Sequence, residues 1–369
     1  MKRLVLLGGG HAQLSVLKRL CTERLVDWEV FLITPYDRQL YSGMLPGWVA
    51  GRYTIDQCAI SLESLARRAG VTLLKTAAVG LDLERREVIC ADGRRQPFDR
   101  VSIDTGPEPA LDGLSGVDQN ALPLRPIEGF VARWPSVVER WRASASAFDI
   151  LIVGGGAGAV ELAFAIDWRA RQEGATHVRV TLLDREAMPL HGAAAAVGKK
   201  ALALLLKRGI RWQGQSAVKH VAPGHVVLHN DAVVTFDACL IVTGAAAPPW
   251  LRLAGLEVDD NGFIRVDRTL RSVSHPEIFA AGDVAAYADP RPKSGVFAVR
   301  AGQVLAINLL ASCKGLGLRD WHPQRRALYL ISTGDRRAIA SWGPWCLDGG
   351  WFWRWKDRID RRFVKLYSD

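Results

Sequence analysis

The chain has 369 residues, 49% of them hydrophobic, and a formal net charge of +10 at pH 7. This length exceeds what one compact core usually organises, so the sequence predicts two domains with an additional segment. Its six cysteines stand at scattered positions without paired spacing, which argues against a disulfide framework and a zinc site and is typical of a reducing cytosol. We therefore expect a cytoplasmic protein with no metal site.

The first predicted element is a strand over residues 3–7 (RLVLL). Its apolar run is too short for a secretory signal, and it ends in glycines rather than at a cleavage site. A helical pattern follows to about Leu20, and WEVFLIT then predicts a second strand. These segments form a β-α-β unit with a glycine-rich turn. Further on, residues 75–93 predict a small β meander, and VSIDTG predicts an apolar strand that ends in Thr-Gly.

The same pattern returns in the second half of the chain. FDILIV is an apolar run that again ends in glycines, and the helical AVELAFAIDWRARQ and the strand VRVTLLD follow it. ACLIVTG is then a second strand that ends in Thr-Gly. The order of glycine loop, Thr-Gly, glycine loop and Thr-Gly predicts an α/β fold in which one dinucleotide-binding unit is inserted within a relative.

Each glycine loop lies where a strand turns into a helix. Such a turn brings backbone N–H groups to a helix N-terminus, where the helix dipole favours a pyrophosphate, and glycine permits the close approach. A single copy is often only structural, but two copies in the β-α-β context favour dinucleotide binding. The positions are Gly8, Gly10 and Gln13 in the first loop, and Gly154, Gly156 and Ala159 in the second.

The residue at the end of the second strand of each unit is placed to contact a ribose. In the second unit this residue is Asp184, which favours NADH because a carboxylate repels the 2′-phosphate of NADPH. Because the adjacent Arg185 leaves room for a 2′-phosphate, NADPH remains an alternative coenzyme. In the first unit the position holds Thr34, a neutral hydrogen-bonding residue.

The segment HPEIFAAGDVAAY, residues 275–287, resembles the second flavin motif of the pyridine nucleotide-disulfide oxidoreductase superfamily. By this resemblance, Asp283 holds the ribityl chain of FAD and the first glycine loop is the FAD site. Within the superfamily the chain is similar to type II NADH dehydrogenases, and to the flavoprotein module found N-terminal to selenide, water dikinase. The segments that carry this likeness are GGGHAQL, YSGMLPG, PKSGVFAVRAGQVLAINL, LISTGDRRAIAS and WRWKDRIDRRF.

The resemblance implies two nested Rossmann-like domains, as in the glutathione-reductase-like fold, with a small C-terminal extension. The implied boundaries are 1–118 and 248–316 for the FAD-binding domain, 119–247 for the inserted NAD(P)H-binding domain, and 317–369 for a basic, tryptophan-rich domain. The implied FAD contacts are Gly8, Gly10, His11, Ala12, Thr34, Ala78, Thr105, Gly106, Gly282, Asp283, Gly295 and Val296. The implied NAD(P)H contacts are Gly154, Gly156, Ala159, Asp184 and Gly244.

The chain also departs from parts of this superfamily. Its disulfide reductases carry a Cys-x4-Cys or Cys-x2-Cys pair beside the flavin, and neither spacing exists in this sequence. The expected enzyme is therefore an FAD-dependent NAD(P)H dehydrogenase without a redox-active disulfide. Sulfide:quinone reductases depend on cysteines near the flavin, and none of the six cysteines falls in a matching segment.

Two polar residues are candidates for catalysis. Glu161, about one turn into the second helix, matches a glutamate that orients the nicotinamide carboxamide in the resembling family; the alternative is an ordinary first-turn helix acid. Lys293 precedes a helix whose first turn, at Gly295 and Val296, would direct N–H groups at the flavin pyrimidine ring, where negative charge develops on reduction. Lys293 could equally be a solvated loop residue.

Apolar residues near the first unit are candidates for contact with the electron acceptor. The resemblance places the segment RQLYSGMLPGW against the flavin face opposite the nicotinamide, where it could form a slot for a planar quinone. Core packing is an equal alternative for each residue. For His11 we favour packing against the cofactor over proton transfer. The slot residues are Tyr41, Met44, Leu45 and Pro46.

The C-terminal segment predicts an amphipathic helix over residues 351–367. Such a helix can lie in an anionic membrane interface, at the inner face of the membrane, or pack on the flavin domain or on a second subunit of a homodimer. No nucleic-acid-binding motif accompanies it. Its apolar face was predicted from Phe352, Trp355, Ile359, Phe363 and Leu366, and its cationic stripe from Arg354, Arg358, Arg361 and Lys365.

Three functions follow from these observations. The first is an FAD-dependent oxidoreductase that passes hydride from NADH or NADPH to the flavin and on to a quinone or another small acceptor. The second is a flavin-bearing partner module for another protein, such as selenium-handling machinery. The third is a specialised flavin oxidase or an enzyme resembling sulfide:quinone reductase.

Overall fold

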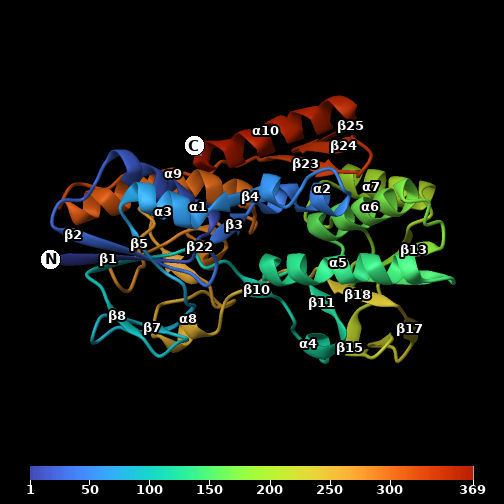
Figure 1. Cartoon of the computed structure of the whole chain (residues 1–369), viewed down its shortest axis with the longest axis horizontal. Helices are drawn as coiled ribbons and strands as arrows, with labels where there is room; N and C mark the ends of the chain where they lie inside the picture. The colour runs from blue at the N-terminus through green and yellow to red at the C-terminus, as the bar shows by residue number, and fades with distance from the viewer. Residues whose placement is uncertain (369) are drawn as a thin grey trace.

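The computed structural model of the chain describes residues 1–368. Its first half is built on a parallel sheet with the strand order β21-β9-β1-β2-β5, covered by helices α1, α3 and α9 (Figure 1). The central strands are apolar and buried on both faces, as expected for a parallel sheet between helices. The bounds are β1 Lys2–Leu7, β2 Trp28–Ile33, β5 Thr72–Leu74, β9 Arg100–Ile103, β21 Ile278–Ala280, α1 His11–Thr22, α3 Leu62–Ala69 and α9 Gly295–Cys313.

A second parallel sheet with the order β11-β18-β12-β13-β14 forms the core of the other half. Its edge strand β11 pairs with β18. In each half, as predicted, a strand (β1 or β12) leads through glycines into a helix (α1 or α6). The bounds are β11 Leu122–Pro123, β12 Phe148–Val153, β13 Val178–Leu183, β14 Arg211–Gln213, β18 Ala238–Ile241, α5 Ile127–Ala143, α6 Ala157–Gln172 and α7 Ala195–Lys207. The predicted α/β class with parallel sheets is confirmed.

The chain passes between the two halves along a short antiparallel pair, β10 (Glu108–Pro109) with β19 (Ala245–Ala246). Strand β21 follows the second sheet in the chain, yet it pairs with β9 in the first sheet. Each half also carries an antiparallel meander, of which the first was predicted. These are β6 Ala78–Asp82, β7 Glu87–Cys90 and β8 Arg95–Pro97, and β15 Val218–Ala222, β16 His225–Leu228 and β17 Val233–Thr235.

Short elements complete both halves. They are β3 Arg38–Leu40, η1 Ser42–Met44, α2 Leu45–Val49, η2 Asp56–Cys58, β4 Ala59–Ser61, α4 Val117–Asn120, α8 Trp250–Leu253, β20 Ile264–Val266, η3 Gly282–Val284 and β22 Ala285–Tyr287.

The C-terminal segment forms an antiparallel sheet and a long helix. The strands are β23 (Leu328–Ser332), β24 (Ala338–Trp342) and β25 (Trp345–Gly349), and helix α10 (Gly350–Ser368) follows them. Helix α10 runs along the top of the molecule above both halves (Figure 1). One face of α10 packs on the rest of the protein. The structure therefore realises one of the predicted alternatives, in which this helix packs on the protein's own domains.

The face of α10 that packs differs from the predicted one. The buried residues are Asp360, Phe363, Val364 and Tyr367. Of the five predicted apolar residues Phe363 alone is buried, and Trp355, Ile359 and Leu366 are exposed. The apolar pattern was misleading because the packed face contains a buried carboxylate beside its apolar side chains, while the exposed strip keeps its hydrophobic residues.

Helix α9 has the length and apolar composition of a membrane-crossing helix, with a mean hydropathy of 1.6. In this fold 61% of that stretch is buried inside the protein. Gly302, in the middle of the helix, lets α9 approach α1 closely, since a Cβ there would lie 2.7 Å from the Cα of Ala12. Its composition is therefore explained by its packing against α1 and the first sheet.

Candidate dinucleotide sites between two glycine loops

The first glycine loop is closed by the strand that ends in Thr-Gly. Gly8 has a φ of +84°, and a Cβ at this position would lie 2.4 Å from the carbonyl oxygen of Asp104. A Cβ on Gly10 would lie 2.4 Å from the carboxylate of Asp104. Both glycines are therefore required by the close approach of backbone and side chain, as predicted for a dinucleotide loop.

The second loop has the same construction. Gly154 has a φ of +131°, and a Cβ there would lie 2.2 Å from the carbonyl oxygen of Val242. Asp184 stands beside this loop, since a Cβ on Gly155 would lie 2.9 Å from its carboxylate. The backbone N–H of Glu186 donates a 2.7 Å hydrogen bond to Asp184 Oδ1, which fixes the carboxylate. An acidic group is thus held beside the second loop, where a ribose hydroxyl would need it.

Each half also has a buried threonine hydroxyl without a hydrogen-bond partner. Thr105 Oγ1 and Thr243 Oγ1 occupy the same position in the two Thr-Gly turns. His11 Nε2 and Ser294 Oγ are buried and unpartnered in the first half. Because buried polar atoms are almost always hydrogen-bonded, such atoms indicate that a polar ligand completes each site. The residues present therefore fit a dinucleotide in both halves.

Asp283 lies in η3, at the end of β21. Its carboxylate is 3.8 Å from the guanidinium of Arg125. Burial raises the pKa of Asp283, while the charges of Arg125 and Lys293 oppose this shift. The flavin motif thus brings a largely buried carboxylate to the C-terminal edge of the first sheet, where open α/β sheets bind their ligands.

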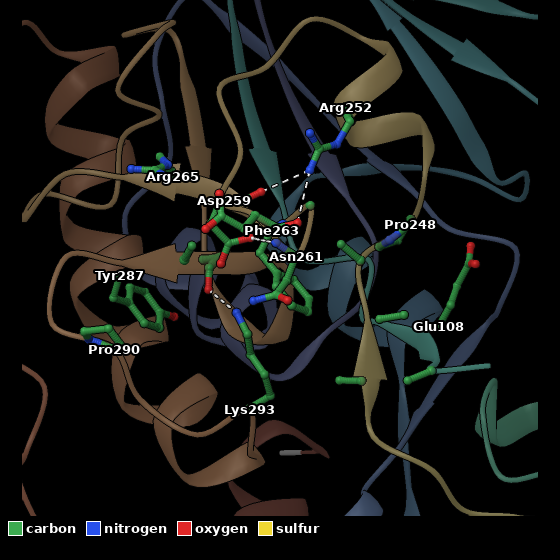
Figure 2. Close-up of a pocket in the computed structure, with 18 of the residues that line it drawn as sticks. Glu108, Pro248, Arg252, Asp259, Asn261, Phe263, Arg265, Tyr287, Pro290 and Lys293 are labelled. Atoms are coloured by element: carbon green, nitrogen blue, oxygen red, sulfur yellow. Dashed lines mark hydrogen bonds between the residues drawn. The ribbon is translucent and has the colours of Figure 1, made fainter. Parts of the chain in front are cut away.

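Lys293 lies before α9, at the rim of a cavity of about 1470 Å³. Its ammonium group donates a 2.5 Å hydrogen bond to the carbonyl oxygen of Ala285 and lies 3.7 Å from the ring centroid of Phe263, as Figure 2 shows. Burial lowers the pKa of Lys293 to about 8, and Asp283 and Asp259 partly oppose the shift. The side chain is therefore held in place rather than free in a solvated loop.

This cavity is a separate feature from the glycine loops. It opens beside the β10–β19 crossing, between Glu108 and Arg252 on one side and Tyr287 on the other (Figure 2). Lys293 lines this cavity, but none of the residues predicted to hold FAD does.

Helix α9 begins at Gly295 and Val296, with Ser294 as its N-cap. The Ser294 side chain does not cap the helix, so the N–H groups of Gly295 and Val296 stay available to a ligand, while the N–H of Phe297 donates to the Ser294 carbonyl oxygen. A Cβ on Gly295 would lie 4.0 Å from Ser42 Oγ in η1. The start of α9 thus lies near the segment that carries Tyr41.

Tyr41 stacks on Phe363 of α10, with ring centroids 4.4 Å apart. His11 joins this cluster, 5.5 Å from Tyr41 and 5.8 Å from Phe363. Burial lowers the pKa of His11 to about 4, so the imidazole is neutral at pH 7. The other predicted slot residues, Met44, Leu45 and Pro46, are buried in the hydrophobic cores. Core packing, the stated alternative, describes them in this structure.

Glu161 is a partly buried residue of α6 and meets the C-terminal segment. Its Oε1 accepts a 2.8 Å hydrogen bond from the backbone N–H of Ser332. Burial raises the pKa of Glu161 to about 7, against the charge of Lys356 and the Ser332 bond. It is therefore not a solvated first-turn acid, and it can hold or release a proton near neutrality.

Lys356 of α10 connects Glu161 to the segment around Tyr41. Its ammonium group donates 2.6 Å hydrogen bonds to the carbonyl oxygen of Gly43 and to Asp360 Oδ2. Although burial lowers the pKa of Lys356, the charges of Asp360 and Glu161 raise it overall. A positive charge is thus kept inside the junction of the two halves and the C-terminal helix.

The remaining predicted contacts lie on several different elements. Thr34 follows β2 and accepts a long, 3.4 Å hydrogen bond from the N–H of Tyr36. The others are Ala12 and Ala159 in the first turns of α1 and α6, Ala78 at the start of β6, Gly106 and Gly244 after the two threonines, Gly156 before α6, and Gly282 at the start of η3.

The sequence reasoning missed several residues at these sites. Asp104 precedes Thr105 directly, and its acidic side chain in an apolar strand was a signal that could have been used. Lys356 and Asp360 stand four positions apart, a spacing that usually marks an exposed helical pair. Ser332 acts through its backbone N–H, which leaves no signal in its side chain.

The model of the pyridine nucleotide-disulphide oxidoreductase family matches residues 2–302. The chain therefore belongs to this family, and the predicted resemblance is confirmed. It is an oxidoreductase of the FAD-dependent, NAD(P)H dehydrogenase-like class. Within residues 1–368 its six cysteines are free thiols.

Curated relatives match across most of the chain. Demethylphylloquinone reductase NdbB of Synechocystis is 26% identical over 293 residues, which are 77% of this chain and 72% of that protein. Human apoptosis-inducing factor 3 is 24% identical over 297 residues, and this chain spans 46% of its length.

Solved structures share the fold. The sulfide:quinone oxidoreductase from Aquifex aeolicus superposes with a TM-score of 0.83 at 19% identity, covering 100% of this chain and 92% of that one. NDH2 from Plasmodium falciparum superposes with a TM-score of 0.82 at 14% identity, covering 100% of this chain and 99% of that one. At these identities the likeness shows the fold alone.

Proposed function

We propose that this protein binds FAD at the first glycine loop and NADH at the second, and passes electrons from NADH to a quinone or another small acceptor. The observation that carries the proposal is the repeated construction of the two sites. In each half a required glycine faces the strand that ends in Thr-Gly, beside a buried threonine hydroxyl without a partner. The Synechocystis relative is a demethylphylloquinone reductase, which supports a quinone as acceptor.

The proposed organisation is two nested dinucleotide-binding domains. Residues 1–118 and 248–316 form the FAD-binding domain, residues 119–247 the inserted NADH-binding domain, and residues 317–369 the C-terminal domain. The pairing of β21 with β9 supports this division, since the first sheet takes strands from both sides of the proposed insertion. The crossing β10–β19 pair lies near both of its boundaries.

FAD, when bound, supplies the hydride chemistry between nicotinamide and acceptor. The contribution of this chain is to position the two dinucleotides and to exclude water. Gly8, Gly10 and the α1 N-terminus would hold the FAD pyrophosphate, and Asp283 would accept a hydrogen bond from its ribityl chain. The N-terminus of α9, at Gly295, would stabilise negative charge at the flavin ring, and Lys293 would add to this field.

Glu161 is the proposed acceptor for the nicotinamide carboxamide. The Ser332 bond fixes the direction of its carboxylate, and the buried Lys356 favours its ionised form. Tyr41 and His11 would form an aromatic wall at the flavin together with Phe363 of α10. Asp184 would bind the ribose of NADH and exclude the 2′-phosphate of NADPH.

We further propose that the outer face of α10 docks on an anionic membrane surface, which would give the acceptor quinone access to the enzyme. Trp351, Trp355, Ile359 and Leu366 are exposed on this helix, and Trp342, Trp345 and Leu347 are exposed on the hairpin beside it. Exposed aromatic and cationic residues on one helix face are typical of an interfacial helix. The basic residues exposed along this helix are Arg354, Arg358 and Lys365, whereas Arg361 pairs with Asp357 and lies over the ring of Tyr53.

The flavin content of purified variants tests the FAD site. Asp283→Ala should purify with much less FAD than the wild type, because a buried ribityl hydroxyl loses a charged acceptor worth roughly 1.5 to 3 kcal/mol. Asp260→Ala, in an exposed loop, is the control and should keep its flavin. Full flavin occupancy in Asp283→Ala would remove this residue from the site.

A further inference from the structure

A buried carboxylate occupies the N-terminus of α1, where the proposed FAD pyrophosphate would bind. Asp104 Oδ2 accepts hydrogen bonds from the backbone N–H groups of Ala12 (2.8 Å) and Gln13 (2.9 Å). Its other oxygen faces η3, since a Cβ on Gly282 would lie 2.3 Å from Asp104 Oδ1. The side chain is 3% exposed. Asp104 therefore fills the space between the glycine loop and the flavin motif.

The fold itself does not need this carboxylate. The equivalent position of the second unit, directly before its Thr-Gly, is Val242. Asp104 and Val242 make the same backbone contacts: each N–H donates to the carbonyl oxygen of the last residue of the neighbouring central strand, Leu7 or Val153, at 2.8 Å. The two turns are thus built alike with an acid in one and an apolar residue in the other. The carboxylate is a feature of the FAD unit alone.

One other carboxylate, that of Asp283, lies near Asp104, and no cation is paired with Asp104 among residues 1–368. Burial raises the pKa of Asp104 to about 7; the bonds from Gln13 and Ala12 oppose the shift, and the charge of Asp283 adds to it. Asp283 has Arg125 at 3.8 Å, whereas within residues 1–368 no Lys or Arg forms an ion pair with Asp104. The titratable and charged groups that face this region are His11 in α1, Asp283 in η3, Tyr287 in β22, Arg125 before α5 and Lys293 before α9.

We propose that Asp104 takes up a proton from solvent when FAD binds, so that flavin binding by this protein is coupled to proton uptake. The inference rests on the proposed function of the first glycine loop. A pyrophosphate brings negative charge to the same helix N-terminus that Asp104 already caps, and two anions there repel each other. Protonation removes this repulsion, and the neutral carboxyl keeps an oxygen for the N–H groups of Ala12 and Gln13.

The sign of the pH dependence follows from linkage. Burial raises the pKa of Asp104 to about 7, and the charge of a bound pyrophosphate would raise this pKa further. Between these two pKa values the flavin-bound protein carries more protons than the free protein. The dissociation constant for FAD therefore rises with pH, by up to about tenfold per pH unit, and is flat below about pH 7.

The test is the dissociation constant for FAD of the full-length, flavin-loaded protein, measured by stepwise dilution and the fluorescence of released FAD. We expect the constant to rise between about pH 7 and pH 8 in the wild type. Asp104→Asn, which keeps an oxygen acceptor but has no charge, should show no rise in this range and bind FAD more tightly than the wild type at pH 8. The Lys293→Met variant should keep the rise between pH 7 and pH 8, because burial lowers the pKa of Lys293 only to about 8 and the loss of its positive charge would weaken FAD binding above that pH.

The matched control is Asp99→Asn. Asp99 precedes the same strand β9 at its other end and accepts a 2.7 Å hydrogen bond from the N–H of Arg3, away from the glycine loop. The FAD dissociation constant of Asp99→Asn should depend on pH in the same way as that of the wild type. A wild-type constant that is flat from about pH 6 to pH 8, or an Asp104→Asn protein with the wild-type slope, overturns the inference.

A second measurement needs no variant and decides the case if Asp104→Asn does not fold. In weakly buffered solution with a pH indicator, rebinding of FAD to the wild-type protein near pH 7.5 should consume a substantial fraction of one proton per FAD. Binding without proton uptake overturns the inference and leaves the proposed function intact. A chain that binds no FAD at any pH overturns the proposed function itself.

Discussion

The backbone N–H of Ser332 donates a 2.8 Å hydrogen bond to the carboxylate of Glu161, a residue 171 positions earlier in the chain. Ser332 ends the first strand of the C-terminal sheet, and Glu161 lies in the helix that follows the second glycine loop. The C-terminal segment therefore fixes a side chain of the proposed nicotinamide site. It also places the buried cation Lys356 near the same carboxylate.

The first prediction concerns Glu161→Gln. Because burial raises the pKa of Glu161 to about 7, flavin reduction by NADH should become faster as the pH rises through 7 and the better, ionised acceptor forms. The amide keeps a hydrogen-bond acceptor without charge, so this transition should disappear and the rate should fall roughly ten- to hundredfold, as for a lost charged hydrogen bond of about 1.5 to 3 kcal/mol. Stopped-flow bleaching across pH measures both effects. An unchanged pH profile in Glu161→Gln would contradict this role.

The second prediction concerns Phe363. This side chain is 8% exposed and stacks on Tyr41, so Phe363→Ala should lower the free energy of unfolding by about 3 to 5 kcal/mol. Trp351→Ala is the matched control on the same helix, because Trp351 is 72% exposed and its loss should change stability by less than about 0.5 kcal/mol. Denaturant unfolding and flavin content measure the difference. Equal stability of the two variants would show that α10 does not belong to the folded core.

The third prediction concerns the outer face of α10. Arg354→Glu combined with Arg358→Glu should weaken binding to anionic vesicles by more than tenfold, since each basic residue near such a surface contributes about 1 kcal/mol, and added salt should weaken the wild type in the same way. The control is Arg85→Glu combined with Arg133→Glu, which changes the net charge by the same amount at two sites away from α10, in the first meander and on α5. Co-sedimentation with anionic and neutral vesicles compares them. If both double variants lose binding equally, the attraction is unspecific and α10 is not the docking face.

The fourth prediction concerns the choice of coenzyme. Asp184→Ser removes the charge that would repel a 2′-phosphate and one acceptor for the ribose of NADH, so the preference for NADH over NADPH should narrow. Asp184→Asn keeps the bond from Glu186 and tests the charge separately. The ratio of kcat/KM for the two nucleotides measures the effect. A ratio that both variants leave unchanged would place the ribose elsewhere.

The glycine loops could be predicted because their requirement is a backbone one. Gly8 and Gly154 have positive φ and stand against carbonyl oxygens, and only glycine satisfies both conditions, so the pattern is readable in the sequence. The parallel sheets could be predicted from apolar runs such as β12, which is buried on both faces.

The residues that join distant segments could not be predicted. Nothing in the sequence indicates that Ser332 meets Glu161 through its backbone, or that the ammonium group of Lys356 is buried rather than solvated. Helix α10 was assigned the wrong packed face because hydrophobic periodicity does not register a buried carboxylate such as Asp360. Such contacts depend on tertiary structure, which decides the burial of polar groups case by case.

The most direct test of electron transfer from NADH is to mix the purified, flavin-containing protein anaerobically with NADH and to follow the visible absorption of the flavin. The proposed function predicts that about one equivalent of NADH bleaches the flavin band, that NADPH does so more slowly, and that a soluble quinone then restores the oxidised spectrum. A flavin that neither nucleotide reduces would contradict the central claim that the second glycine loop delivers NADH to a flavin in the first.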